Sequence, residues 1–318
     1  MKYLVTGGAG FIGSHVAEAL ISAGHEVGVL DDFSTGKLEN VPGGCRVFRV
    51  DIRDARAVLD KLAEFRPQGV SHQAAQASVS LSMRDPKADV MTNVVGSLNL
   101  FDACVATGVE RVVFASTGGA IYGEVPEGQT ADESWPARPQ SPYAISKLSV
   151  EQLLEVYRTQ HGLDTAVLRY ANVYGPRQDP HGEAGVVAIF MQRLLDGLPL
   201  GINARVTAGD AGCVRDYVFV ADVVQANLAA LAGGLGERIV NVGTGIGTST
   251  RELATKIGAI SGRRVAFSSS PPRAGDLKCS VLNATLSRSM LGAQHALDAG
   301  LTRTWHWFEE RAQDSKSG

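Results

Sequence analysis

The feature that most constrains this 318-residue chain is a glycine-rich turn close to its beginning. Lys2–Thr6 reads as a short buried strand, residues 7–13 have the sequence Gly-Gly-Ala-Gly-Phe-Ile-Gly, and a helical pattern follows. Gly7, Gly10 and Gly13 let this turn tighten and bring backbone N–H groups to a pyrophosphate at the helix N-terminus. Because the glycines stand between a strand and a helix, the segment predicts a dinucleotide-binding βα unit.

Two acidic residues follow the next expected strand. Glu26–Leu30 is apolar and ends in Asp31 and Asp32. An acid about 20 residues past the glycines is placed to bind the hydroxyls of the adenosine ribose. Its negative charge would also repel a 2′-phosphate, so the pattern favours NAD over NADP.

The alternation of strands and helices continues through the first half of the chain. We predict strands at Arg46–Val50, Gly69–His72, Arg111–Ala115 and Thr165–Arg169, and helices at Asp54–Phe65, Pro86–Thr107 and from Tyr143 to about His161. This order indicates an α/β protein with a doubly wound, parallel Rossmann sheet. Ligands of such sheets bind beyond the carboxyl ends of the strands. Polar or small residues stand there at Asp31, Asp51, 73–75 (Gln-Ala-Ala) and 116–117 (Ser-Thr).

The character of the sequence changes beyond Tyr170. Residues 175–185 are rich in Gly, Pro and charge and predict a loop. Helices are expected at Val186–Leu195, Asp222–Leu231, Thr250–Ile260 and Thr302–Arg311, strands at Val214–Val220 and Arg238–Val242, and a frayed polar tail at 313–318. We therefore expect an NAD-binding domain at 1–175 and a smaller, mixed α/β substrate-binding domain at 176–318. The second would be discontinuous, because about 215–245 is expected to pack back onto the first.

The segment Ser141–Lys147 is the strongest candidate for catalysis. Ser141 can cap a helix, and Pro142 suits its first turn, where a missing N–H costs nothing. Tyr143 and Lys147 then lie on one helical face. The helix N-terminus and the ammonium group both stabilise a phenolate, which makes Tyr143 a candidate general base or acid. The short pattern alone also fits a surface Tyr/Lys pair.

Composition excludes several classes of function. The net charge of −3 gives no sign of a nucleic-acid binder. The four cysteines are scattered, so neither a disulfide framework nor a zinc site is expected, and a reducing cytoplasm fits. We identify no secretory signal and no apolar run of the ~20 residues that a membrane span needs.

Motifs spread over nearly the whole chain carry a resemblance to a known family. They lie at 5–13, 51–52 (Asp-Ile), 72–75 (His-Gln-Ala-Ala), 121–123 (Ile-Tyr-Gly), Tyr143 with Lys147, 168–175, 214–217 and 272–276. With them, the sequence resembles an extended short-chain dehydrogenase/reductase of the UDP-glucose 4-epimerase family. The motifs are less specific for the substrate, because nucleotide-sugar epimerases, dehydratases and decarboxylases share most of them.

The resemblance implies NAD as cofactor and a nucleotide-diphosphate sugar as substrate. It places at the cofactor Gly7, Gly10, Phe11, Ile12, Gly13, Asp31, Asp32, Asp51, Ile52, Gln73, Ala74, Ala75, Asn93, Ser116, Tyr143, Lys147 and Tyr170. It places at the substrate Thr117, Asn172, Gly185, Val186, Arg215, Arg273, Asp276 and Ser280. Arginine suits the bidentate geometry of a pyrophosphate. Taken alone, however, Arg215 and Asp216 read as a surface ion pair.

The implied reaction is redox-neutral. Tyr143 takes the proton of the sugar 4-hydroxyl, NAD takes the C4 hydride, and the 4-keto sugar turns before the hydride returns to its opposite face. The family usually has Ser or Thr where this chain has Gly118, so Thr117, or less favourably Ser116, is expected to supply the hydroxyl. Ser280 stands where a large tyrosine limits the sugar pocket in some relatives, which suggests room for an N-acetyl group. A homodimer through the Pro86–Thr107 and Tyr143–His161 helices is also implied.

Three other functions compete with this interpretation. A dehydratase needs an acid and a base where this chain has Gly119 and Ala120, which cannot move protons. A decarboxylase would share the fold and the first hydride transfer. A non-catalytic NAD-binding regulator would need neither Tyr143 nor Lys147, so their presence argues against it. No metal site is expected.

Overall fold

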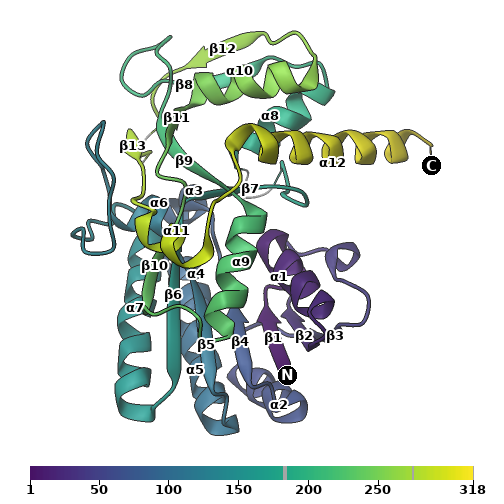
Figure 1. Cartoon of the computed structure of the whole chain (residues 1–318), viewed down its shortest axis with the longest axis vertical. Helices are drawn as coiled ribbons and strands as arrows, with labels where there is room; N and C mark the ends of the chain where they lie inside the picture. Colours follow the sequence, from purple (N-terminus) through teal and green to yellow (C-terminus); the bar gives the residue numbers. More distant parts are fainter. Residues whose placement is uncertain (182–184, 274–275, 318) are drawn as a thin grey trace.

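The computed structural model describes residues 1–181, 185–273 and 276–317, and side chains up to residue 313 (Figure 1). Its largest element is a seven-stranded sheet with the strand order β10-β6-β5-β4-β1-β2-β3. The strands are β1 (Lys2–Thr6), β2 (Glu26–Asp31), β3 (Arg46–Arg49), β4 (Gly69–His72), β5 (Arg111–Thr117), β6 (Asp164–Tyr170) and β10 (Ile239–Val242). Every neighbouring pair is parallel. The predicted doubly wound sheet is confirmed.

Helices cover both faces of this sheet. One face carries α1 (Phe11–Ser22) and α9 (Val220–Leu231), and the other carries α2 (Ala55–Phe65), α5 (Gly96–Thr107) and α7 (Pro142–His161). Alternate residues of a strand point to opposite faces of the sheet. Tyr3 and Val5 of β1 pack with α1 and α9, whereas Leu4 packs with α2 and α5. The strands are therefore buried on both sides, as a parallel sheet requires.

The expected helix Pro86–Thr107 is interrupted. It consists of α4 (Pro86–Val90), a π-helical turn η2 (Met91–Val95) and α5, and α3 (Val79–Arg84) precedes it. Contrary to the sequence expectation, this 22-residue run is long and apolar enough, by length and composition alone, to cross a membrane. The run packs against α2 and α7, buries Asp89 fully and leaves Val90, Met91 and Val105 exposed.

The rest of the chain forms a smaller α/β part at the upper end of Figure 1. It contains β7 (Asn172–Tyr174), β8 (Leu200–Asn203), β9 (Val214–Phe219), β11 (Gly247–Ser249), β12 (Phe267–Ser270) and β13 (Cys279–Ser280). β9 pairs with β7, β11 and β13, and β8 pairs with β12. The helices α8 (Val186–Leu195), α10 (Thr250–Ser261) and α12 (Leu297–Ser317) share a third apolar cluster. From β9 the chain returns through α9 and β10 to the large sheet.

The C-terminal helix differs from the expectation. α12 begins at Leu297 and remains helical to Ser317, so the predicted frayed tail is wrong for residues 313–317, while Gly318 lies outside the described residues. Leu301, Trp305 and Phe308 anchor it in the third cluster. Each further residue then adds a hydrogen bond to a helix that already exists, which is the inexpensive step of helix formation.

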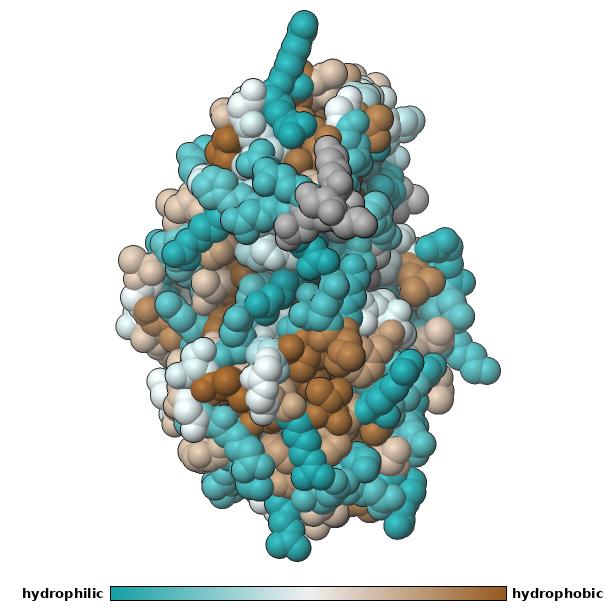
Figure 2. All heavy atoms as spheres, turned by 90° about the vertical axis from the view of Figure 1, so that its right-hand side faces the viewer, coloured by the Kyte–Doolittle hydropathy of each residue, from teal (hydrophilic) through white to brown (hydrophobic). Residues whose placement is uncertain are grey.

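α12 also reaches back to the large sheet. Arg311 pairs with Glu39 of the short helix η1 (Leu38–Asn40) at 2.6 Å. Figure 2 shows the side of the molecule on which α12 ends, where apolar side chains gather below the middle of the view.

Candidate functional site

The glycine turn has the shape that a dinucleotide phosphate requires. Gly7 has a positive φ of 65°, and a Cβ there would come within 2.7 Å of the Ala74 backbone nitrogen. A Cβ on Gly13 would lie 2.2 Å from the carbonyl oxygen of Gly7. The first turn of α1, with Phe11 and Ile12, therefore packs directly on β1 and β4 at the point where the strand order reverses. These residues fit the pyrophosphate of NAD.

Asp31 ties the end of β2 to this turn. Its carboxylate accepts the N–H groups of Ala9 at 3.0 Å and Phe33 at 2.8 Å. Burial raises the pKa of Asp31, and the two N–H donors oppose that shift. Each carboxylate oxygen keeps a second lone pair for a ribose hydroxyl. Asp32 caps the following turn through Ser34.

Asp51 and Ile52, the residues expected at the adenine, follow β3. Arg53 pairs with Asp51 at 2.5 Å, and its hydrogen bonds hold the pKa of that carboxyl below the usual range. Ile52 is buried and packs on Gly96, where a Cβ would come within 2.7 Å of it. Ile52 thus joins α5 to the edge at which Asp31 stands.

A directed chain of hydrogen bonds holds the segment after β4. The Ser97 hydroxyl donates to the Asn93 carbonyl at 2.5 Å, so it accepts from Nε2 of His72 at 2.9 Å. Nδ1 of His72 then accepts from the Thr6 hydroxyl at 2.7 Å, and Thr6 accepts the Ala74 N–H at 3.3 Å. Burial, assisted by the charge of Lys147, lowers the pKa of His72 to about 3, so the ring is neutral.

Three further cofactor candidates are held by neighbouring side chains. The Asn93 amide binds both backbone groups of Gln76, which fixes residues 73–76. The Tyr170 hydroxyl receives N–H bonds from Asn227 at 2.8 Å and Gln73 at 3.3 Å. Burial raises the pKa of Tyr170 to about 12. Ala75 follows on the same segment and is half-buried.

Tyr143 and Lys147 stand at the start of α7 as expected. The Ser141 hydroxyl accepts the Ala144 N–H at 3.3 Å, and Pro142 occupies the first turn. The Lys147 ammonium lies 6.0 Å from the centre of the Tyr143 ring and donates to the carbonyl of Ala115 at 2.9 Å. The helix therefore presents both groups at the carboxyl end of β5.

The structure gives a reason for the glycine that departs from the family pattern. A Cβ on Gly118 would lie 2.5 Å from Leu282 Cδ1, whereas the space around Gly119 is open to 3.6 Å. The Thr117 hydroxyl oxygen would be 3.9 Å from a Cβ on Gly119, and Asn172 Nδ2 would be 3.6 Å from it. Thr117 and Asn172 therefore face one space, and that space also borders α6 (Gly118–Ile121).

Ser116 is engaged within the protein. Its hydroxyl donates to Glu151 at 2.5 Å, and Glu151 also binds Arg169. Sequence reasoning did not single out Glu151 or Arg169. The sequence does contain a signal for both residues. Arg169 is a charged residue in an otherwise apolar strand, and Glu151 follows Tyr143 and Lys147 at the same four-residue spacing on one helical face.

The smaller α/β part of the chain supplies the candidate residues on the other side of the site. Asp216 is only 1% exposed and accepts the Thr244 and Gly245 N–H groups. The alternative of an Arg215–Asp216 surface ion pair is therefore wrong, because Asp216 holds a turn in the interior. Burial raises the pKa of the Cys213 thiol, and the charge of Arg215 lowers it.

The remaining substrate candidates border the described gaps or lie in the interior. Arg273 and Asp276 are exposed and are joined by a backbone hydrogen bond of 3.2 Å. Gly185 precedes α8, Val186 begins it, and a Cβ on Gly185 would come within 2.4 Å of the Gln178 side chain. Ser280 is buried and donates to the Gly119 carbonyl at 3.0 Å.

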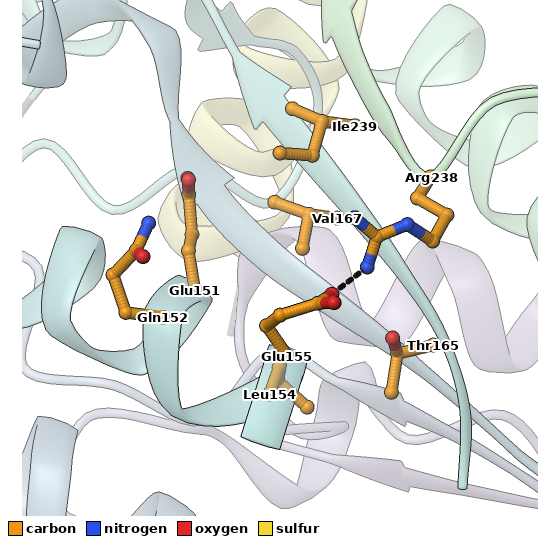
Figure 3. A pocket seen from close by; sticks show the side chains of 8 residues that line it. All are labelled: Glu151, Gln152, Leu154, Glu155, Thr165, Val167, Arg238 and Ile239. Carbon is orange, nitrogen blue, oxygen red and sulfur yellow. Dashed lines mark hydrogen bonds and ion pairs between the residues drawn. The ribbon is translucent and has the colours of Figure 1, made fainter. Parts of the chain in front are cut away.

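No group of three or more His, Cys, Asp or Glu side chains in the described residues is arranged to hold a metal ion. A separate pocket of about 160 Å³ is lined by residues of α7, β6 and the start of β10 (Figure 3). Its lining includes Glu151, Glu155 and Arg238.

Together, the parallel sheet, the glycine turn and the Tyr143–Lys147 pair define an extended short-chain dehydrogenase/reductase. Residues 3–243 match the model of the NAD dependent epimerase/dehydratase family. The chain belongs to this family.

Individual relatives match over almost the full length. The chain is 45% identical over 320 residues to the UDP-glucose 4-epimerase of Mycolicibacterium smegmatis, with 98% of this chain and 100% of the relative covered. It is similar to the structure of the Thermus thermophilus UDP-glucose 4-epimerase complex with NAD (TM-score 0.93, 53% identity, coverage 97% and 99%). It is also similar to the Thermotoga maritima UDP-glucose 4-epimerase with UDP-glucose (TM-score 0.91, 44% identity, coverage 98% and 100%).

Proposed function

We propose that this protein is an NAD-dependent nucleotide-sugar 4-epimerase that interconverts UDP-glucose and UDP-galactose through a 4-keto intermediate. The observation that carries the proposal is that Tyr143 and Lys147 lie together at the start of α7, with the Lys147 ammonium bonded to the Ala115 carbonyl two residues before Thr117. The glycine turn that fits a dinucleotide lies along the same edge of the sheet. The similarity to UDP-glucose 4-epimerases over almost the full chain supports it.

The proton steps belong to Tyr143. Its phenolate takes the proton of the sugar 4-hydroxyl and later returns it to the same oxygen, while the Thr117 hydroxyl orients that oxygen. Lys147 favours the phenolate by its charge and donates a hydrogen bond to the dinucleotide ribose. NAD, when bound, supplies the chemistry of accepting and returning a hydride at the sugar C4. The reaction is redox-neutral, so the cofactor is retained.

The nucleotide anchors the substrate in the proposed mechanism. Arg215 and Arg273 bind the pyrophosphate, Asp276 binds the ribose, and Asn172 with the backbone of Gly185 and Val186 holds the remaining diphosphate oxygens. Arg215 of β9 stands opposite Ser280 of β13, four residues after Asp276, which supports this division of roles. The sugar itself has few fixed contacts, which lets the 4-keto form present either face.

This assignment divides the chain into two units. Residues 1–175 form the NAD-binding domain, completed by α9 and β10, and the remainder of 176–318 binds the nucleotide sugar. The participation of β10 in the large sheet supports the return of the chain. A dehydratase is disfavoured, because Gly119 and Ala120 stand where that reaction needs an acid and a base.

We also propose a cytoplasmic homodimer. Four cysteines without disulfide partners favour a reducing compartment. Exposed apolar side chains are frequent on α3, α4, η2, α5 and α7, namely Leu81, Met83, Val90, Met91, Val105, Ile145 and Val156. Such a face suits a second copy of the chain. Light scattering of Ile145→Asp against the parent tests this, because a charge there should produce monomers.

The central test is product analysis. Purified protein is incubated without added NAD with UDP-glucose, UDP-N-acetylglucosamine or dTDP-glucose, and products are identified by NMR. We expect UDP-galactose to form from UDP-glucose without release of NADH. Stoichiometric NADH would indicate a dehydrogenase, and a 4-keto-6-deoxy product would indicate a dehydratase.

A further inference from the structure

A buried ion pair stands directly behind the proposed catalytic groups. Arg169 of β6 donates to the Glu151 carboxylate through Nη2 at 2.6 Å and through Nε at 3.0 and 3.2 Å. The two side chains are 7% and 1% exposed. Such a pair gives little net stability over an apolar core, because both charges must leave water.

The pair belongs to a network whose hydrogen bonds have fixed directions. Arg169 Nη1 donates to the Tyr122 hydroxyl at 2.9 Å, and that hydroxyl donates to Asn241 Oδ1 at 2.8 Å. The Asn241 amide in turn donates to the carbonyl of Ala131 at 3.0 Å. The network joins Tyr122, the residue after α6, to α7, β6 and β10, and a fully paired buried network of this kind makes the core rigid.

The network contacts β5 through the hydroxyl of Ser116. Glu151 accepts the Ser116 O–H at 2.5 Å, and Lys147, one turn earlier, donates to the carbonyl of Ala115 at 2.9 Å. α7 thus holds β5 at two consecutive residues, and the next residue is Thr117. Tyr143, Lys147 and Glu151 follow one another at intervals of four along the helix.

We propose that Glu151 is a positioning residue, which Arg169 orients and which acts through Ser116 to fix the end of β5, and with it Thr117, relative to Tyr143. The inference rests on the proposed epimerase function. The hydrogen bond from Ser116 to Glu151 sets how far β5 projects beside α7, and Lys147 sets the neighbouring point. Without the bond at Ser116, the end of β5 would keep its pairing with β6, where Thr117 stands opposite Tyr170, but it would lose its side-chain attachment to Glu151 of α7.

The helix provides a matched control. Glu155 lies one turn after Glu151 and also pairs with arginines, Arg158 and Arg238, but its side chain is 39% exposed. Figure 3 shows Glu155 turned toward Arg238 and Glu151 turned away from it. Glu155→Gln therefore removes an arginine-paired carboxylate from the same helix without touching β5.

The test compares Ser116→Ala, Glu151→Gln and Glu155→Gln with the parent holoenzyme. For each, kcat and KM for UDP-glucose, the bound NAD per chain and the unfolding temperature are measured. A displacement of about 1 Å can reduce turnover about 10²-fold. We expect Ser116→Ala to lower kcat about 5- to 50-fold with KM and NAD content within about twofold of the parent. Glu151→Gln should lower kcat further, and Glu155→Gln should match the parent.

Ser116→Ala keeps the ion pair, so it remains informative if Glu151→Gln does not fold. Ser116→Ala with parental kcat would overturn the positioning role while leaving the epimerase function intact. An equal loss in Glu155→Gln, or a loss explained by lower NAD content, would also overturn it. A parent without turnover of any nucleotide sugar would overturn both proposals.

Discussion

Gly118 offers a test of how tightly the end of β5 is packed. In an ordinary helix, replacing glycine by alanine stabilises by up to about 1 kcal/mol. Here a Cβ would lie 2.5 and 2.9 Å from the two methyl carbons of Leu282 and 3.1 Å from the Arg169 carbonyl oxygen. Leu282 is 1% exposed and belongs to the core between the sheet, α1 and α9, so it cannot move aside freely.

Overpacking of this kind costs about 1–3 kcal/mol. We therefore expect Gly118→Ala to lower the free energy of unfolding by about 1–2 kcal/mol, measured by urea denaturation with NAD at one fixed, saturating concentration. Gly119→Ala is the control in the same short helix, because its Cβ would meet atoms no closer than 3.6 Å. Its stability should remain within about 0.5 kcal/mol of the parent.

A second substitution identifies the cause. Leu282→Ala alone should cost about 2–5 kcal/mol, because it opens a cavity in the core. In the double variant the alanine at 118 has space, so the two costs should fall short of additivity by about 1 kcal/mol or more. Strictly additive costs, or a Gly118→Ala variant as stable as Gly119→Ala, would refute the steric explanation.

The remaining predictions concern chemistry and pH. Tyr143→Phe should lower kcat by about 10²–10⁴-fold with NAD still bound, whereas Lys147→Ala should also weaken NAD retention; both are checked by turnover and by the 260 nm absorbance of released cofactor. Thr117→Val should cost about 10²–10³ in kcat, and unchanged turnover would remove its assigned role. Ser280→Tyr should lower kcat/KM for UDP-N-acetylglucosamine more than for UDP-glucose, and an unchanged ratio contradicts the pocket argument. Burial lowers the pKa of His72 to about 3 in the folded protein, so the unfolded chain binds a proton at this residue first as the pH falls below about 6.5. The free energy of unfolding should therefore decline by up to about 1.4 kcal/mol per pH unit because of this group. His72→Gln should show a shallower decline in urea denaturation measured over the same pH range.

The sequence predicted the large sheet well because its signals are local. The strand before Gly7, the acid at the end of β2 and the cap at Ser141 each depend on neighbouring residues, and the structure places all three as expected. The π-helical turn Met91–Val95 is not indicated in the same way, and the partner of its Asn93 is Gln76, 17 residues earlier in the chain.

Long-range partners account for the other differences. Asp216 reads as a surface residue beside Arg215 until β10 brings the turn at Thr244 against it. The buried Glu151–Arg169 pair joins a helix residue to a strand residue. The sequence around either residue does not indicate its partner. The length of α12 follows from its contacts with α8 and α10, whereas its sequence beyond residue 312 is polar.

The position of β10 at the edge of the large sheet has a consequence for biosynthesis. β10 pairs its residues Ile239–Val242 with Val167–Tyr170 of β6. The sheet is therefore complete only after the ribosome has made the intervening chain. Until then, β6 is an open edge, and the apolar face of the sheet lacks the cover that α9 gives it. Nascent chains that stop before α9 expose both features, which favour edge-to-edge aggregation. The late return of the chain thus makes completion of the large sheet dependent on residues synthesised after the whole of β9.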